Sequence, residues 1–469
     1  MSLVLFLALS VVTFPMFALQ AEIDPEAIEY FRKGEALIGT EKEFSEEQEQ
    51  FFARAVEIAP NFAAARHNLA VVCLKRGKLD EALHQLDEVV RLDPGNINAR
   101  LLRADIRVQK GELNEAAEEL EQIIKLEPDD VHVIEQLGNI RIRQKRYADA
   151  VPLLQRVASH SNNRSADVHY NLGLALQNLG RRKEALSSYL NFLKREPNDP
   201  YANLQVGLIL KEEGRKEEAV KHLVKAFDGG VNDAAVAEEL GNLYLDLGNE
   251  QEARKYLARA DLNSPVALAN LGVAAKRQGD YAEAEKNFRA ATAKDPRNPE
   301  IWSHLGDVLT SQKKDGAAIE AYRKALELKP SDFNTLFNLG SVYANLGRNT
   351  EAQQALEQAV KIRPDAARAH LHLALVLDRQ EQAAAARDHY LAALKNGADD
   401  PQAHFRLAVL FSREKDVESS LRHLEIAFAR QPDKYVPVVV EELKNVHSDL
   451  DAIRYTKAFN DLLAKYQRR

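Results

Sequence analysis

A fixed spacing of 34 residues runs through this chain. Three prolines, Pro60, Pro94 and Pro128, lie at this interval. The same interval separates the members of two glycine sets, Gly173, Gly207 and Gly241, then Gly272, Gly306 and Gly340. A period in this range is typical of a repeat array, in which one unit cannot bury its apolar face alone. Because contacts in such an array join neighbouring units, a chain of 469 residues need not divide into separate globular domains.

Each period contains two helical patterns separated by a turn. In residues 61–96, the first apolar stretch includes Leu69 and Cys73, Gly77 interrupts it, and helical spacing resumes at Leu79. Pro94 closes the unit because proline cannot continue a helix. Several units also begin with a capping side chain followed by proline at the first helical position. These starts are Asp24-Pro25, Asp199-Pro200, Ser264-Pro265, Asn298-Pro299 and Asp400-Pro401.

A small residue recurs at one place in the second helix of ten units, twelve residues after the Gly or Ala of the first helix. A small side chain lets the two helices approach closely, and a larger one would overpack their crossing by about 1–3 kcal/mol. The positions are Ala82, Ala116, Ala150, Ala185, Ala219, Ala253, Ala284, Ala318, Ala352 and Ala386.

This combination resembles the tetratricopeptide repeat (TPR). In residues 301–330 (IWSHLGDVLTSQKKDGAAIEAYRKALELKP), the motif residues of that family are Trp302, Leu305, Gly306, Ala318, Tyr322, Ala325 and Pro330. The resemblance implies an all-α fold, a right-handed α-solenoid of about twelve helix-turn-helix units within residues 22–434. The units start near residues 27, 63, 97, 131, 166, 200, 234, 265, 299, 333, 367 and 401.

The last residues, 435–469, are predicted to form C-terminal capping helices. The pattern indicates one helix over 436–445 and a second over 449–467, with Ser448 as the cap of the second. An array needs such ends because a terminal unit has a neighbour on one side only.

The first 21 residues carry no charge after the initiating methionine, and the first charged residues, from Glu22, are acidic. This pattern favours a secretory signal peptide cut after Ala21. An uncleaved membrane anchor is the alternative, since about 20 apolar residues suffice to cross a bilayer. Both interpretations predict an exported protein, periplasmic or secreted, that contacts the membrane only through this segment. A cytosolic start is the remaining alternative.

Composition and motifs give no support to catalysis, metal binding or nucleic-acid binding. The 63 Lys and Arg residues against 71 Asp and Glu give a net charge of −8, without the basic cluster that nucleic-acid binding requires. No phosphate-binding glycine loop is present, so no cofactor is expected. His370 and His372 are two residues apart, a spacing that points side chains to different sides of a helix. The single cysteine, Cys73, is predicted to be buried.

The resemblance implies that the first helix of each unit lines an inner face, with the residue two before the Gly or Ala pointing into it. Eight of eleven such residues are Asn, Gln or His. Side-chain amides both donate and accept hydrogen bonds, as the backbone of an extended peptide requires. The alternative is that these positions are only solvated. The candidate ligand-binding residues are Asn68, Gln136, Asn139, Asn171, Gln205, Asn270, His304, Asn338, His372 and Arg406.

Asn139 is included because Asn139 and Asn171 reproduce the asparagine pair with which chaperone-binding TPR proteins hold a C-terminal carboxylate. Glu135 and Gln205 stand where two of the basic partners would be, so heat-shock chaperone tails are not expected ligands.

The sequence therefore predicts a non-catalytic scaffold of the cell envelope or secretion pathway that binds proteins or extended peptides. A helper protein for polysaccharide export is the alternative, since amides and aromatic rings also suit sugars. A glycosyltransferase-associated subunit is a remote third prediction. It follows from similarity to the repeat region of O-linked N-acetylglucosamine transferase. The catalytic domain of that enzyme would need far more than the roughly 35 residues that follow residues 431–433, so transferase activity itself is not expected.

Overall fold

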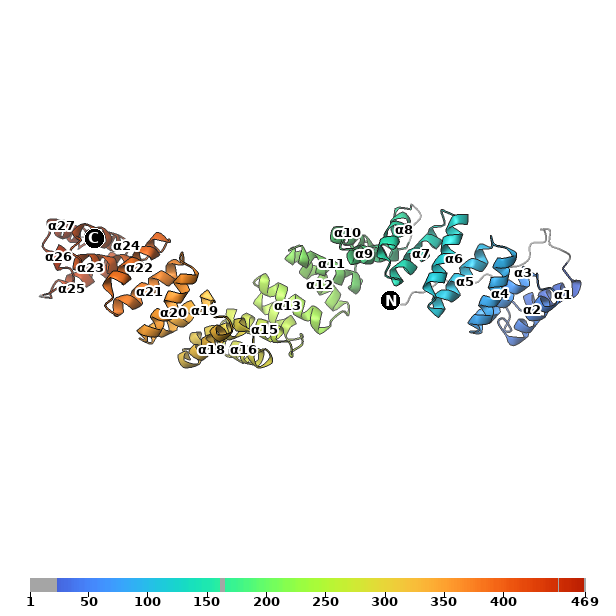
Figure 1. Ribbon diagram of the computed structural model, residues 1–469, viewed down its shortest axis with the longest axis horizontal. Helices are drawn as coiled ribbons and strands as arrows, with labels where there is room; N and C mark the ends of the chain where they lie inside the picture. Colours follow the sequence, from blue (N-terminus) through green and yellow to red (C-terminus); the bar gives the residue numbers. More distant parts are fainter. Residues whose placement is uncertain (1–22, 161–164, 446, 468–469) are drawn as a thin grey trace. The chain divides into compact units, whose positions relative to one another are not determined.

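The computed structural model describes residues 23–160, 165–445 and 447–467. Within these ranges every regular element is a helix and there is no strand, which confirms the all-α prediction. The chain divides into two compact units, Met1–Asn232 and Asp233–Arg469. In each unit the helices follow one another in sequence order (Figure 1).

The first unit holds twelve helices in its described part. They are α1 (Pro25–Glu35), α2 (Glu46–Ile58), α3 (Ala63–Lys75), α4 (Leu79–Leu92), α5 (Ile97–Lys110), α6 (Leu113–Leu126), α7 (Val131–Arg143), α8 (Tyr147–Ser159), α9 (Asp167–Asn178), α10 (Arg182–Leu193), α11 (Pro200–Glu212) and α12 (Lys216–Asp228).

The second unit begins with α13 and holds the remaining described helices. They are α13 (Ala234–Asp246), α14 (Glu250–Leu257), α15 (Pro265–Arg277), α16 (Tyr281–Lys294), α17 (Pro299–Ser311), α18 (Asp315–Leu328), α19 (Phe333–Asn345), α20 (Asn349–Ile362), α21 (Ala367–Arg379), α22 (Ala383–Lys395), α23 (Pro401–Arg413), α24 (Val417–Arg430), α25 (Pro432–Glu442), α26 (Asp451–Arg454) and α27 (Lys457–Gln467).

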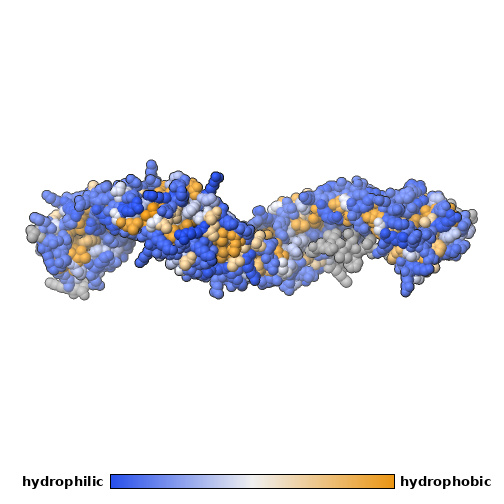
Figure 2. Space-filling model, turned by 90° about the horizontal axis from the view of Figure 1, so that it is seen from below, coloured by the Kyte–Doolittle hydropathy of each residue, from blue (hydrophilic) through white to orange (hydrophobic). Residues whose placement is uncertain are grey.

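Helices α1 to α24 form twelve pairs, and within each unit each of these helices packs on its neighbours in the chain. The first helices of the pairs begin within two residues of the predicted unit starts. The described chain is thus a solenoid of helix-turn-helix repeats. The face seen in Figure 2 is mainly hydrophilic, with small hydrophobic areas between the polar residues.

The predicted helix starts are confirmed at all five proline sites. In each, the side chain before the proline accepts a hydrogen bond from a backbone N–H of the first turn, which satisfies a donor that the helix leaves unpaired. These caps are Asp24, Asp199, Ser264, Asn298 and Asp400.

The contact between the two helices of a repeat explains the glycine period. A Cβ atom on Gly306 in α17 would lie 2.5 Å from the Tyr322 ring in α18, closer than carbon atoms approach. The alanines predicted at the helix crossings, such as Ala318, are fully buried. Glycine and alanine therefore allow the close helix packing that the sequence predicted.

The C-terminal end differs from the prediction. The expected single helix over 449–467 is two helices, a four-residue α26 and the longer α27. The break lies at Thr456, whose hydroxyl donates to the Ile453 carbonyl and accepts from the Phe459 N–H. Such a side-chain bond to the backbone competes with helix continuation. Phe459 and Tyr466 of α27 are buried with Phe428 of α24, so these helices cover the last repeat.

The predicted signal peptide or anchor, residues 1–21, lies outside the described residues. Among the described helices, none is long and apolar enough to cross a membrane.

Candidate binding groove

A groove of about 890 Å³ crosses three successive repeats of the second unit. Its walls come from the first halves of α17, α19 and α21 and from the turns that precede α19 and α21. The groove includes His304 and Asn338, two of the predicted binding residues, and also Asp307, which was not predicted. Its volume lies in the range of small-ligand pockets.

Aromatic side chains form the middle of this groove. Phe333 and Phe337, one turn apart on α19, stack with ring centroids 6.1 Å apart and an angle of 3°. His372 of α21 meets Phe337 edge-on at 5.0 Å. The Arg363 guanidinium lies over the Phe333 ring, 3.3 Å from its centroid, and donates to the Asn334 side chain at 3.0 Å. The groove thus offers half-buried rings to an apolar side chain.

Charges of both signs line the same groove. Glu300 of α17 is exposed at one end, and Arg368 of α21 is exposed at the other. Within the described residues neither side chain makes a hydrogen bond or an ion pair. They stand two repeats apart, and the exposed Asp365, in the turn before α21, adds a second carboxylate near Arg368.

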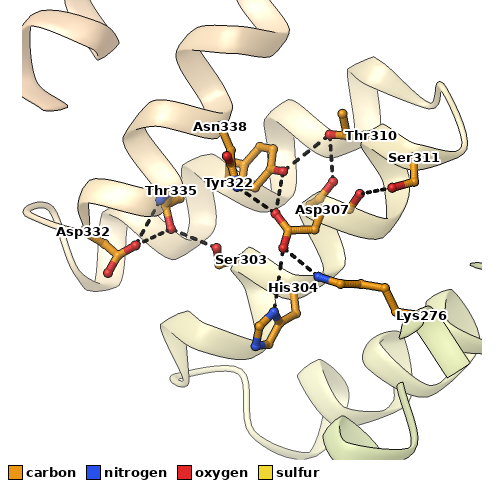
Figure 3. A network of polar contacts seen from close by, with 11 residues as sticks. Lys276, Ser303, His304, Asp307, Thr310, Ser311, Tyr322, Asp332, Thr335 and Asn338 are labelled. Atoms are coloured by element: carbon orange, nitrogen blue, oxygen red, sulfur yellow. Dashed lines mark hydrogen bonds and ion pairs between the residues drawn. The ribbon is translucent and has the colours of Figure 1, made fainter. Parts of the chain in front are cut away.

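The wall formed by α17 contains a polar network around Asp307 (Figure 3). The Tyr322 hydroxyl and the Asn338 amide each donate to Asp307 Oδ1 at 2.9 Å. The Lys276 ammonium, from the preceding repeat, lies 2.9 Å from Oδ2. His304 Nδ1 is 3.8 Å from Oδ2, beyond hydrogen-bond distance. Asp307 therefore connects three successive repeats, through α15, α17 and α19.

The network keeps Asp307 ionised. Burial on its own would raise its pKa, but the contacts with His304 and the Lys276 ammonium outweigh burial and lower the pKa of Asp307 to about 2. Burial, and then the Asp307 charge, raise the pKa of Tyr322. Tyr322 consequently stays a hydrogen-bond donor at any physiological pH.

The same three-part contact occurs twice more. A buried tyrosine of a second helix bonds to a polar side chain of its own first helix, which in turn bonds to the next repeat. Tyr189 donates to Gln177 at 2.8 Å, and Gln177 donates to Gln205 at 2.9 Å. Tyr390 contacts Asp378 at 3.4 Å, and Arg406 donates to Asp378. The sequence-predicted residues Gln205, Asn338 and Arg406 are the third members of these contacts.

Other predicted residues also bridge neighbouring repeats. Asn171 donates to Asn139 at 2.8 Å, and Asn270 donates to Asn242 at 2.6 Å. His372 Nδ1 lies 3.1 Å from the Ser341 hydroxyl. Since an amide has two N–H donors and a carbonyl, one such bond leaves it further hydrogen-bonding capacity. The amides thus join repeats, a role that the sequence reasoning missed.

Two predicted residues of the first unit differ from this pattern. Asn68 is 0% exposed, and neither polar atom of its side chain has a hydrogen-bond partner. Gln136 Nε2 lies 3.2 Å from His132 Nε2, while its buried Oε1 has no partner. Asn68 is thus withdrawn from the surface, whereas Gln136 is half-buried, as Asn338 is.

A second recurrent contact joins five of the first helices to the turn before them. Side chains of different types donate to the carbonyl of the proline six residues earlier: Arg66 to Pro60, Arg100 to Pro94, Asn203 to Pro197, Trp302 to Pro296 and His370 to Pro364. Proline has no N–H, so it leaves this carbonyl accessible in a turn that does not continue the helix. Each of these donors stands six residues after a proline, and this constant spacing was the available sequence signal.

Among residues 23–160, 165–445 and 447–467, no group of three His, Cys, Asp or Glu side chains is placed to hold a metal ion. Cys73 is buried, as predicted, and burial raises the pKa of its thiol to about 11.

Comparison with known proteins agrees with this geometry. Models of the tetratricopeptide repeat match residues 51–84, 74–137, 170–228 and 236–266. Another model, described as the Cilia and flagella-associated protein 70 C-terminal domain, matches residues 264–407. Paired helices in a 34-residue register define an α-solenoid of helix-turn-helix repeats. The chain belongs to the tetratricopeptide repeat family.

Three solved structures with similar helices have TM-scores below 0.5. YrrB, "a TPR protein with an unusual peptide-binding site", is 23% identical over 42% of this chain and 97% of its own, with a TM-score of 0.36. PilF of Pseudomonas aeruginosa is 21% identical over 45% of this chain and 97% of its own, with a TM-score of 0.40. A chain of the Naa15/Naa10 complex bound to HypK-THB is 16% identical over 88% of this chain and 72% of its own, with a TM-score of 0.39. No curated protein sequence matches the chain.

Proposed function

We propose that this chain is a non-catalytic protein-interaction scaffold that binds an extended peptide segment in the groove across α17, α19 and α21. The observation that carries the proposal is the groove itself, about 890 Å³ lined by stacked phenylalanines and by unpaired charges of opposite sign. Its length over three repeats suits an extended chain better than a compact small molecule.

Each part of the groove has a role in this proposal. An apolar side chain of the peptide packs on Phe333 and Phe337, which gains the burial of aromatic surface. The amides of Asn338 and Asn334 each have one bond that is already made, to Asp307 and Arg363, and keep capacity for peptide backbone groups. Glu300 and Arg368 set the direction of the peptide, because a basic residue is favoured at the first and an acidic residue at the second.

The absence of catalysis is part of the proposal. The carboxylate with the most strongly lowered pKa in the groove, Asp307, is held by three neighbouring side chains and acts as a structural acceptor. A general base needs a pKa near the operating pH, and that of Asp307 is about 2.

Selection of linear peptides from a random library with the intact purified chain tests this function. We expect peptides with an apolar residue between a basic and an acidic one, and at least tenfold weaker binding to Phe337→Ala. Glu320→Ala on the exposed side of α18 is the matched control and should bind as the wild type does.

Selected peptides that bind Phe337→Ala and the wild type equally would contradict the proposed groove. An array of oligosaccharides, probed with the same two proteins, covers the polysaccharide-export alternative. Sugar binding that depends on Phe337, with no peptide selected, would replace the peptide by a polymer of sugars as the ligand.

We further propose that the scaffold works outside the cytoplasm, in the cell envelope or secretion pathway. The support is the uncharged run of residues 2–21, with the acidic residues that follow it.

A further inference from the structure

Two successive repeats each carry a pair of histidines that face each other through the same ring nitrogen. His370 Nδ1 of α21 lies 2.9 Å from His389 Nδ1 of α22. His404 Nδ1 of α23 lies 2.8 Å from His423 Nδ1 of α24. Each pair joins the first helix of a repeat to its second helix, and the pairs are 34 residues apart.

The contacts of His370 define where the protons lie. Its Nε2 is 2.9 Å from the Pro364 carbonyl, which can only accept, so Nε2 carries a proton. In the neutral ring Nδ1 is then an acceptor, and His389 Nδ1 must be the donor. The neutral pair therefore makes two good hydrogen bonds. One added proton still leaves a donor facing an acceptor, and only protonation of both rings places N–H against N–H at 2.9 Å.

This pair holds one wall of the groove. Pro364 stands between Arg363 and Asp365, which both line the groove, and its carbonyl also accepts from Asn396 of the same wall at 3.3 Å. Arg363 is the residue that covers Phe333. Loss of the His370 bond to Pro364 would free the turn that positions Arg363.

We infer that the His370–His389 pair is an acid-sensitive latch, which holds the groove wall at neutral pH and opens it on mild acidification. Opening releases a bound peptide, a step that rests on the proposed function. The His404–His423 pair makes the same contact between ring nitrogens in the next repeat, away from the groove.

The charged surroundings agree with this direction. Glu357 and Asp388 favour protonation of His389, but burial and then His370 outweigh them and lower its pKa. At the second pair, Asp399 and Asp400 face His404 with Arg430, and Asp416 faces His423 with Arg422. Burial, then His404, lower the pKa of His423 to about 4.

The direction in which stability changes with pH follows from the linkage between proton binding and folding. A histidine with a lowered folded pKa binds fewer protons than the unfolded chain, whose histidines titrate near 6.5. Stability is complete above this pH and is lost as pH falls toward the folded pKa. Each pH unit within that window changes the local opening constant up to tenfold.

An earlier repeat of the same chain has this arrangement of contacts without histidine rings. Arg66 and Gln85 occupy the equivalent positions of an earlier repeat, with Arg66 Nε bonded to the Pro60 carbonyl at 2.7 Å and Nη1 to Gln85 at 2.6 Å. The double substitution His370→Arg with His389→Gln copies this arrangement and keeps both hydrogen bonds at every pH.

Hydrogen exchange of the intact chain without ligand, corrected for the intrinsic rate, tests the latch between pH 7 and pH 5. In the wild type, protection in α21 and α22 should fall about tenfold more than in α17 and α18, where Trp302 replaces the histidine. The double variant should keep its protection at pH 5. Equal losses in both wild-type repeats, or an acid loss that persists in the variant, would overturn the inference.

If the double variant is already unprotected at pH 7, the substitution His404→Arg with His423→Gln tests the same chemistry in α23 and α24. The release step is measured separately, as the dissociation rate of a selected peptide at the two pH values. Acid opening without any peptide ligand would leave the latch established and the proposed function wrong. If a peptide binds in the groove but hydrogen exchange is the same at both pH values, the proposed function stands and the latch is wrong.

Discussion

The substitution Asp307→Asn tests whether one carboxylate joins three repeats. Asparagine keeps one carbonyl oxygen with two lone pairs, so Tyr322 and Asn338 retain an acceptor, while the charge opposite Lys276 is lost. The pKa of Asp307 is lowered from 3.8 to about 2. At about 1.4 kcal/mol per pKa unit, the carboxylate contributes on the order of 2 kcal/mol. Its side chain is 25% exposed, so solvent screens this contribution only in part.

The pH dependence of this effect has a defined sign. Because the folded pKa lies below the unfolded value, the stabilisation is present above about pH 4 and is lost as pH falls through about pH 2. We expect Asp307→Asn to lower the local free energy of opening by about 2 kcal/mol at pH 7. The difference from the wild type should shrink to roughly half at pH 3.

Hydrogen exchange in α17 and α19 of the full chain measures this difference, because a repeat array need not unfold in one step. Asp315→Asn at the start of α18 is the control: within the described residues Asp315 makes no hydrogen bond or ion pair, and it should change stability by less than about 0.5 kcal/mol. A variant Asp307→Asn as stable as the control at pH 7 would refute the reasoning. So would a difference that stays the same at pH 3.

Four other changes test separate parts of the account. Ala318→Leu should overpack a fully buried helix crossing and destabilise by about 1–3 kcal/mol, and unchanged exchange in its own and adjacent repeats would contradict this packing. Asn338→Ala should weaken peptide binding up to about tenfold, since the lost bond to the peptide costs roughly 0.5–1.5 kcal/mol; an unchanged affinity would leave Asn338 only as a link between repeats. Thr456→Ala should lower the melting temperature by removing the cap of α27, at about 1 kcal/mol, and an unchanged transition would argue against that role. Residues 1–40 fused to a reporter active only outside the cytoplasm should give a signal, whereas a silent fusion would reject export.

The register of the repeats was readable from the sequence because its causes are local. The proline after a capping side chain starts a helix wherever it occurs, as at Asn298 and Pro299. In seven repeats the glycine of the first helix has a close neighbour 16 residues further along the chain, such as Tyr322 opposite Gly306. Local rules repeated twelve times give the helix pairs and their starts.

The partners of the inner-face side chains were not predictable in the same way. Asn338 and Asp307 are 31 residues apart, Asn270 and Asn242 are 28 apart, and the bond in each case depends on how two repeats stack. A polar residue on that face can point to solvent or to the adjacent repeat, and its residue type allows both. Thr456 is a similar case, because a threonine within an apolar pattern can continue a helix or cap the next one.

The measurement closest to the central claim is the location of a bound peptide on the intact chain. A selected peptide that carries a photoreactive group in place of its apolar residue would be cross-linked, and the modified residues of the chain identified. The account predicts modification within the groove, at or beside Phe333 and Phe337 of α19. Modification confined to the exposed side of α18, around Glu320, or to α25–α27 would contradict the groove as the binding site.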